Sequence, residues 1–182
     1  MKTALGLIEF KTVPVGIFAT DEMIKASECK ILFTSPTCPG KYVSIIYGEI
    51  ADVETSIKRG IETGGIFYID SSVIPNINES VISALTGTVN VSDIKALGII
   101  ETIAAVSAIL AGDTVAKAAN VSLLEIRLAR GLGGKGEVFY TGELGAVEAA
   151  NRAVLSMAEK EGGIVSSVVI ARPSPALIQA IV

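Results

Sequence analysis

Residues 4–9, ALGLIE, return at residues 96–101 as ALGIIE, and the two stretches are identical at five of six positions. Each is a short apolar run that ends in a glutamate, a pattern typical of a buried β-strand. At the same spacing of 92 residues, Asp21, Lys25, Ala26 and Leu32 return as Asp113, Lys117, Ala118 and Leu124. A period this long indicates a duplicated domain rather than a solenoid repeat.

The spacing between the two copies grows along the chain. It is 94 residues where Gly40-Lys41 returns as Gly134-Lys135, and 98 residues where Pro75 returns as Pro173. Small insertions in loops account for this growth. We therefore predict two domains, residues 1–92 and residues 93–182, each within the usual size range of a compact domain.

Hydrophobic periodicity predicts the order strand, helix, two strands, helix, strand in each copy. In the first copy the predicted strands are 4–10, 30–35, 42–48 and 66–74, and the helices are 14–28 and 50–63. In the second copy the strands are 96–101, 122–129, 138–140 and 164–170, and the helices are 103–119 and 142–161. The predicted fold class is α+β, with helices on a mainly antiparallel sheet.

Half of the 182 residues are hydrophobic, and the mean hydropathy is +0.58. The longest uncharged stretch, Ser80–Ser92, has 13 residues, whereas a membrane-spanning helix needs roughly 18 or more. We also expect no signal peptide, because Met1-Lys2 leads directly into a strand that the second copy repeats. The apolar composition therefore predicts broad surfaces buried against other subunits rather than a membrane protein.

Charge and residue types exclude several functions. The net charge is −4 and the Lys and Arg residues are scattered, which argues against nucleic-acid binding. The chain contains no histidine, so catalytic triads and histidine metal sites are excluded. Glu9 and Glu101 are candidate bases, but their duplication at equivalent strand ends favours a structural role. The loop 131–136, GLGGKG, lacks the spacing of a phosphate-binding P-loop and the Ser/Thr that follows its lysine.

Cys38 is the strongest candidate for chemistry. It lies in SPTCPGKY, residues 35–42, between two predicted strands. Prolines on both sides restrict the backbone, and Gly40 permits a turn that other residues resist. Such a loop suits the presentation of a metal ligand, but a metal cluster usually needs several thiolates. The position therefore makes chemical sense if symmetry brings several copies of Cys38 together.

Cys29 is expected to have no such role. It aligns with Val121 of the second copy, and a position that accepts valine is typical of a small buried hydrophobic residue. Two cysteines do not make a disulfide framework, so we expect a reducing cytoplasm.

Four stretches resemble the bacterial microcompartment (BMC) shell domain: residues 96–102, 113–120, 142–147 and 171–173. The resemblance covers nearly the whole chain, twice. It implies a tandem-domain shell protein, which assembles as a homotrimer shaped like a pseudo-hexamer. It further implies a structural protein rather than an enzyme, located in a microcompartment shell in the cytoplasm.

The stretch TCPGK, residues 37–41, is similar to the pore loop of the trimeric shell protein of propanediol-utilisation compartments. That resemblance implies one 4Fe-4S cluster per trimer, held by three copies of Cys38, for electron transfer or cluster transport across the shell. The pore loop is then Pro36, Thr37, Pro39, Gly40 and Lys41, together with Cys38. Free backbone N–H groups at Gly40, Lys41 and Thr37 are expected to face the cluster, with Lys41 offsetting its charge and Pro39 acting as a stiffener.

Other interpretations of the loop stay open at this stage. Cys38 as a bare thiol would make the chain a plain metabolite-pore tile, and three thiolates also suit zinc. A redox enzyme subunit would need a second cysteine motif, which the sequence lacks.

The resemblance also assigns the edges of the tile. Lys25 and Lys117 match the family's edge lysine, and Arg172 matches its edge arginine. Ile74 is expected to occupy the position of Arg172 in the first copy. Unequal edges imply other shell proteins as neighbours, and a cluster implies an encapsulated or cytosolic redox protein as a further partner.

Overall fold

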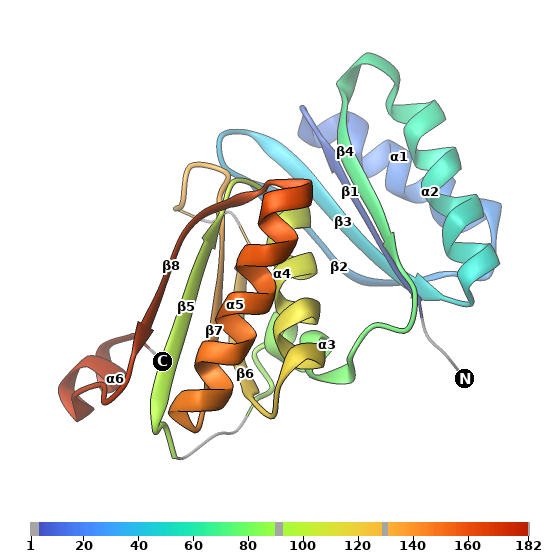
Figure 1. The fold of residues 1–182 in the computed structure, drawn as a ribbon. Helices are drawn as coiled ribbons and strands as arrows, with labels where there is room; N and C mark the ends of the chain where they lie inside the picture. Colours follow the sequence, from blue (N-terminus) through green and yellow to red (C-terminus); the bar gives the residue numbers. More distant parts are fainter. Residues whose placement is uncertain (1–3, 90–92, 129–130, 182) are drawn as a thin grey trace. The chain divides into compact units, whose positions relative to one another are not determined.

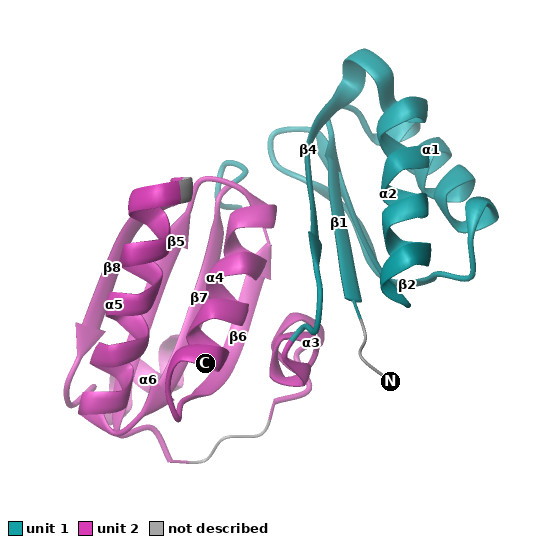
Figure 2. Ribbon diagram, turned by 45° about the vertical axis from the view of Figure 1, so that its right-hand side comes forward, with its two compact units in different colours: residues 1–77, 130–134 teal, residues 78–129, 135–182 magenta. Residues whose placement is uncertain are grey.

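The computed structural model describes residues 4–89, 93–128 and 131–181. Its residues group into two compact units (Figure 2). The first unit contains the described residues up to Ile77 together with Gly131–Gly134, and the second contains the other described residues from Asn78 onward. Among the described helices, none has the length and apolar composition needed to cross a membrane.

Each unit has four strands, and Figure 1 shows two long helices side by side over one face of each sheet. The first copy of the sequence forms β1 Ala4–Phe10, α1 Val13–Ala26, β2 Lys30–Thr37, β3 Lys41–Gly48, α2 Ile50–Gly64, the short 3-10 helix η1 Gly65–Phe67, β4 Tyr68–Ile74 and α3 Glu79–Thr86. The second forms β5 Ala96–Thr102, α4 Ala105–Ala118, β6 Ser122–Leu128, β7 Gly136–Gly142, α5 Leu144–Glu161, β8 Ile164–Ile170 and α6 Pro175–Ile181.

The two sheets have the same antiparallel topology. Their strand orders are β2-β3-β1-β4 and β6-β7-β5-β8. The register shifts at Glu9/Phe10 in β1 and at Glu101/Thr102 in β5, and again at Ile31/Phe33 in β2 and Leu123/Glu125 in β6. These irregularities occupy equivalent positions, so the duplication extends to the details of the backbone. The predicted α+β class and tandem organisation are confirmed.

All twelve predicted strands and long helices are present, with ends that differ by a few residues. The strand expected at 122–129 reaches Leu128, and residue 129 lies outside the described residues. The strand expected at 138–140 is longer, because β7 pairs with β5 as far as Gly136. The sequence analysis missed α3 and α6. Both are short, although Asn78 accepts a hydrogen bond from the Ser80 backbone N–H and caps α3 as a helix-starting residue should.

The predicted domain boundary between residues 92 and 93 adjoins residues 90–92, which lie outside the described part of the chain. In the structure α3 packs against β6 and α4 and therefore groups with the second unit. Helix α3 is thus part of the first copy in sequence and of the second unit in structure. The reason is that its apolar side chains are buried against the second unit.

The central strand of each sheet contains a glycine that allows close packing. An ideal Cβ at Gly98 in β5 would lie 2.1 Å from the Cζ of Tyr140, whose ring is fully buried. Burial raises the pKa of the Tyr140 phenol to about 12. In β1, a Cβ at Gly6 would lie 2.7 Å from the Cγ1 of Val53 on α2. Both strands therefore need glycine at the same repeat position. The side chain that occupies the space is Val53 in the first unit and Tyr140 in the second.

Gly98→Ala is expected to destabilise the protein by about 3 kcal/mol, the upper end of the usual cost of overpacking, since the added methyl would overlap the fully buried Tyr140 ring. Gly145→Ala is the matched control, because Gly145 is exposed on α5 with no atom near its ideal Cβ. Urea-unfolding midpoints measure both. Equal midpoints for the two variants would contradict the proposed clash.

Candidate functional site

Cys38 lies at the turn between β2 and β3, and its thiol is free and partly exposed. The side chains of Ser35 and Thr37, on the strand leading to it, are buried. Thr37 pairs with Lys41 as the last register pair of the two strands, and the Cys38–Pro39 peptide bond is cis. The turn is therefore anchored on both sides while its cysteine faces outward.

The backbone of the turn is already hydrogen-bonded in part. The Gly40 N–H donates to the Thr37 carbonyl at 3.0 Å, so the expectation of a free N–H at Gly40 is wrong. The reason is the tightness of the turn, which brings these two groups together. Gly40 has φ +87°, a left-handed conformation that favours glycine. Its role is to close the turn rather than to face a ligand.

Lys41 has a partner that the sequence analysis missed. Its Nζ lies 3.5 Å from the Oε2 of Glu9, whose side chain is buried. The second unit repeats this ion pair, with Lys135 Nζ 2.7 Å from the Oε1 of Glu101. A buried carboxylate needs such a partner because desolvation disfavours its charge. The structural role expected for both glutamates is therefore supported. The available signal was the return of both Glu9 and Lys41 in the second copy, as Glu101 and Lys135.

A second loop approaches Cys38 within the first unit. An ideal Cβ at Gly134 would lie 2.9 Å from the Cys38 carbonyl oxygen, closer than a side chain tolerates. Gly131, Gly133 and Gly134 all have positive φ, which glycine adopts readily. The glycines of this loop, weighed in the sequence analysis as a phosphate cradle, therefore have structural reasons: backbone conformation at all three, and also packing at Gly134. Gly134 is the repeat counterpart of Gly40, and this correspondence was its signal in the sequence.

Cys29 is buried in the core of the first unit, as expected. An ideal Cβ at Gly48 would lie 3.2 Å from its Sγ, and in the second unit a Cβ at Gly142 would lie 3.2 Å from the Cγ1 of Val121. The thiol and the valine methyl therefore fill the same packing position. Burial leaves Cys29 without access from solvent.

One chain contributes Cys38 alone to a thiolate site. In the described ranges, no three His, Cys, Asp or Glu side chains lie close enough together to hold a metal ion. A cluster at Cys38 would therefore need the same residue from further copies of the chain, as the sequence analysis expected from symmetry.

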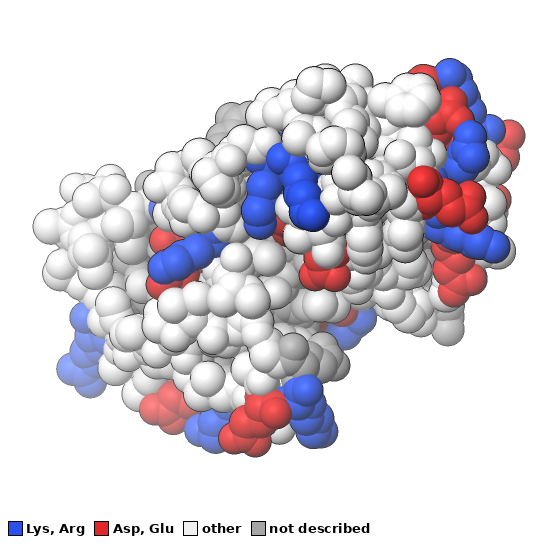
Figure 3. All heavy atoms as spheres, turned by 90° about the horizontal axis from the view of Figure 1, so that it is seen from above, with Lys and Arg blue, Asp and Glu red and all other residues white. Residues whose placement is uncertain are grey.

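The predicted edge lysines lie at equivalent places near the ends of α1 and α4. Lys25 pairs with Asp21, and Lys117 pairs with Asp113, each one helical turn earlier. The hydrogen bond to Asp21 and its charge raise the pKa of Lys25. Both lysine side chains are exposed and remain available to a neighbour. On the face drawn in Figure 3, Lys and Arg side chains are interspersed with Asp and Glu side chains.

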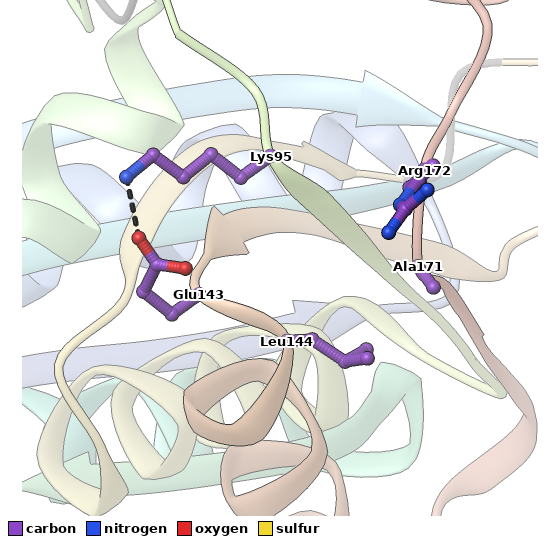
Figure 4. Close-up of a pocket in the computed structure, with 5 residues that line it drawn as sticks. All are labelled: Lys95, Glu143, Leu144, Ala171 and Arg172. Carbon is purple, nitrogen blue, oxygen red and sulfur yellow. Dashed lines mark hydrogen bonds and ion pairs between the residues drawn. The ribbon is translucent and has the colours of Figure 1, made fainter.

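Arg172 is exposed just after β8 and lines a pocket with Lys95, Glu143, Leu144 and Ala171 (Figure 4). The expected equivalence of Arg172 and Ile74 is wrong. Ile74 pairs with Leu5 as Ile170 pairs with Leu97, so the strand register makes Ile74 the counterpart of Ile170. At that spacing of 96 residues, Asn76 is the counterpart of Arg172. The first copy still lacks the arginine.

The BMC domain matches residues 4–77 and again residues 96–173. The chain belongs to the BMC domain family. The tandem BMC organisation expected from the repeated stretches is thereby confirmed, and the matched ranges leave both α3 and α6 outside the domain itself.

Known BMC proteins resemble this chain over nearly its full length. The bacterial microcompartment shell protein PduT of Citrobacter freundii is 34% identical over 173 residues, covering 95% of this chain and 94% of PduT. The carboxysome assembly protein CcmO of Synechococcus elongatus is 26% identical over 93% of this chain and 65% of its own length. A crystal structure of a microcompartment protein from Desulfitobacterium hafniense has a TM-score of 0.93 at 37% identity, covering 98% of this chain and 99% of that one.

The two cysteines should differ sharply towards a thiol reagent. In the iron-free native protein, Cys38 is expected to react with Ellman's reagent at once, because its thiol reaches solvent, while Cys29 reacts only after unfolding. Cys38→Ser should abolish the fast reaction and Cys29→Ser should preserve it. A fast reaction at Cys29 would show that its packing position is open.

Proposed function

We propose that three copies of the chain form a shell tile in which the Cys38 thiolates jointly hold one 4Fe-4S cluster at the central pore, for electron transfer or cluster transport across the shell. The observation that carries this proposal is a free, partly exposed thiol on an anchored turn, in a chain whose fold has a duplicated BMC domain.

The coarser part of this function follows from the family. The chain is a structural shell protein of a bacterial microcompartment and not an enzyme, in keeping with relatives that are shell or carboxysome assembly proteins. Its location is the microcompartment shell. The two candidate bases, the buried Glu9 and the partly exposed Glu101, are each paired with a lysine.

The residues of the turn suit an iron–sulfur cluster. Thiolates are the usual iron–sulfur ligands, and three of them around a cubane leave one iron open to water or to an outside ligand. When bound, such a cluster supplies one-electron redox chemistry. Cys38 would hold it, Pro36 and Pro39 would limit the movement of the sulfur, and Thr37 anchors the strand beneath.

Lys41 would act electrostatically rather than as a ligand. Its ammonium group is shared with Glu9, so the pair brings little net charge to the loop. A cluster with negative charge would draw Lys41 away from Glu9, and exposure and hydrogen bonds near the sulfurs would set its potential. Partners of the tile would be other shell proteins along its edges and a redox protein that exchanges electrons or the cluster.

Cys38→Ser is expected to abolish cluster binding while changing the stability by less than about 0.5 kcal/mol, because a surface turn contributes little to the core. Serine lacks the soft thiolate that iron–sulfur clusters require. Anaerobic reconstitution with iron and sulfide should give about four irons per three wild-type chains, and none with Cys38→Ser. Electron paramagnetic resonance after reduction reads the outcome.

Cys29→Ser is the matched control for this experiment. It should keep the cluster and lose about 1 kcal/mol of stability, because a hydroxyl replaces a buried thiol among apolar neighbours, while Ser27 Oγ, 3.4 Å from the Cys29 Sγ, offers it one polar contact. A wild type that binds no iron would leave a plain metabolite-pore tile, and zinc in place of iron would indicate a three-thiolate zinc site. If Cys29→Ser lost the cluster and Cys38→Ser kept it, the ligand would be Cys29 and the proposal would be wrong.

Changing Lys25 or Lys117 to alanine is expected to leave the trimer intact and to reduce the assembly of tiles into sheets. Each edge contact is repeated across a layer, so a small loss per contact multiplies. Electron microscopy measures the assembly of tiles into sheets, and sedimentation measures separately whether the trimer is intact. Lys58→Ala, at an exposed position on α2, is the control. Dissociation of the trimer by both edge variants would place these lysines inside it.

A further inference from the structure

Helix α3 covers a specific surface of the second unit, formed by α4 and β6. Its side chains Val81 and Ala84 are buried. At the start of the helix, the Asn78 backbone N–H donates to Asp113 Oδ1 at 2.9 Å, while the other carboxylate oxygen of Asp113 pairs with Lys117. The contact therefore combines an apolar helix face with one charge-assisted hydrogen bond.

The surface that α3 covers has an uncovered counterpart in the first unit, formed by α1 and β2. Ile17 and Ile31 are 53% and 46% exposed there, whereas their repeat counterparts Ile109 and Leu123 are 0% and 2% exposed. Phe18, at 58%, is the most exposed of the three apolar side chains on this surface. Because both units share one fold and register, the difference lies in what covers them.

Asp21 completes this correspondence. It is the counterpart of Asp113 and pairs with Lys25 through Oδ2, as Asp113 pairs with Lys117. Within the described part of the chain no donor is found for its Oδ1, the atom equivalent to the one that receives the Asn78 N–H. The first unit thus offers both the apolar surface and the acceptor for an incoming helix.

Helix α6 is the repeat counterpart of α3. Strand register sets a spacing of 96 residues between β4 and β8, and this spacing aligns Asn78 with Ser174, Val81 with Leu177 and Ala84 with Ala180. Leu177 and Ala180 are exposed, while Ile178 and Ile181 on the same helix pack against a cluster in their own sheet that includes Leu97 and Phe139. One side of α6 is therefore fixed to its own unit and the other is uncovered.

We propose that α6 of one copy docks on the α1–β2 surface of a second copy of this chain, in the way that α3 docks on α4 and β6. Leu177 and Ala180 would cover Ile17, Phe18 and Ile31, and the Asp21 carboxylate would accept a backbone N–H at the start of α6. A second copy is the fitting partner because both complementary surfaces stay exposed within one chain, and the same pairing already occurs inside it.

This contact joins different surfaces of the two copies. Such a heterologous contact generates a closed ring or an open filament, and the trimer of the proposed function is the ring. The inference rests on the proposed function in one respect, that the contacts close into a ring of three copies. It does not depend on the cluster.

The test uses two variants that each remove one side of the contact, Phe18→Asp and Leu177→Asp. Both positions are exposed, so folding should be preserved, and circular dichroism checks this. In analytical ultracentrifugation the wild type should sediment as a trimer and each variant as a monomer. Ile66→Asp is the control, because Ile66 is a large exposed side chain on η1, an element that belongs to neither α1, β2 nor α6, and it should leave the trimer intact.

Mixing the variants gives the decisive result. Phe18→Asp retains an intact α6 and Leu177→Asp retains an intact α1–β2 surface, so the mixture should form a one-to-one dimer that cannot grow further. Folded variants that remain trimeric would overturn the inference while leaving the trimer itself established through another surface. A mixture that stays monomeric would overturn it as well. A monomeric wild type would instead overturn the assembly in the proposed function.

Discussion

The central strands β1 and β5 impose the main constraint on this chain. Each is hydrogen-bonded along both edges and is largely buried along its length. Its side chains must therefore pack on both faces of the sheet. Glycine at position 6 or 98 removes a side chain where a valine or tyrosine must enter. The glutamate near the end of each strand is tolerated because it pairs with a lysine, Lys41 at the start of β3 or Lys135 just before β7. Lys41, which pairs with Glu9, is also the first residue of β3 and follows the turn that carries Cys38. The ion pair therefore fixes one end of that turn.

Much of the fold could be predicted because the domain sequence occurs twice in the chain. The repeated stretch at 4–9 and 96–101 predicted both central strands, and hydrophobic periodicity predicted the long helices. The short helices α3 and α6 could not be predicted in this way, because two turns of helix carry too few residues for a clear period. The equivalence assigned to Ile74 failed for a related reason. A spacing taken from one proline pair ignored the strand register, which hydrogen bonding fixes.

The site was predictable in part. Proline, glycine and a lone cysteine indicated a rigid, exposed turn, and the contrast of Cys29 with Val121 indicated a buried thiol. The hydrogen bond from Gly40 to Thr37, the pairing of Lys41 with Glu9 and the approach of Gly134 were not predicted. Each depends on residues that are distant in sequence or on the exact closure of a turn, and neither composition nor spacing reports such geometry.

The tandem arrangement has a consequence for stoichiometry. A ring of six identical single-domain subunits can place only six copies of any residue around its axis. A ring built from fused pairs presents each residue three times, and the two halves are free to diverge. In this chain the counterpart of Cys38 is Leu132, set in a glycine-rich loop. The two copies of this loop therefore differ, and in the proposed trimer the fused chain would present three thiols rather than six, with the same fold around each loop.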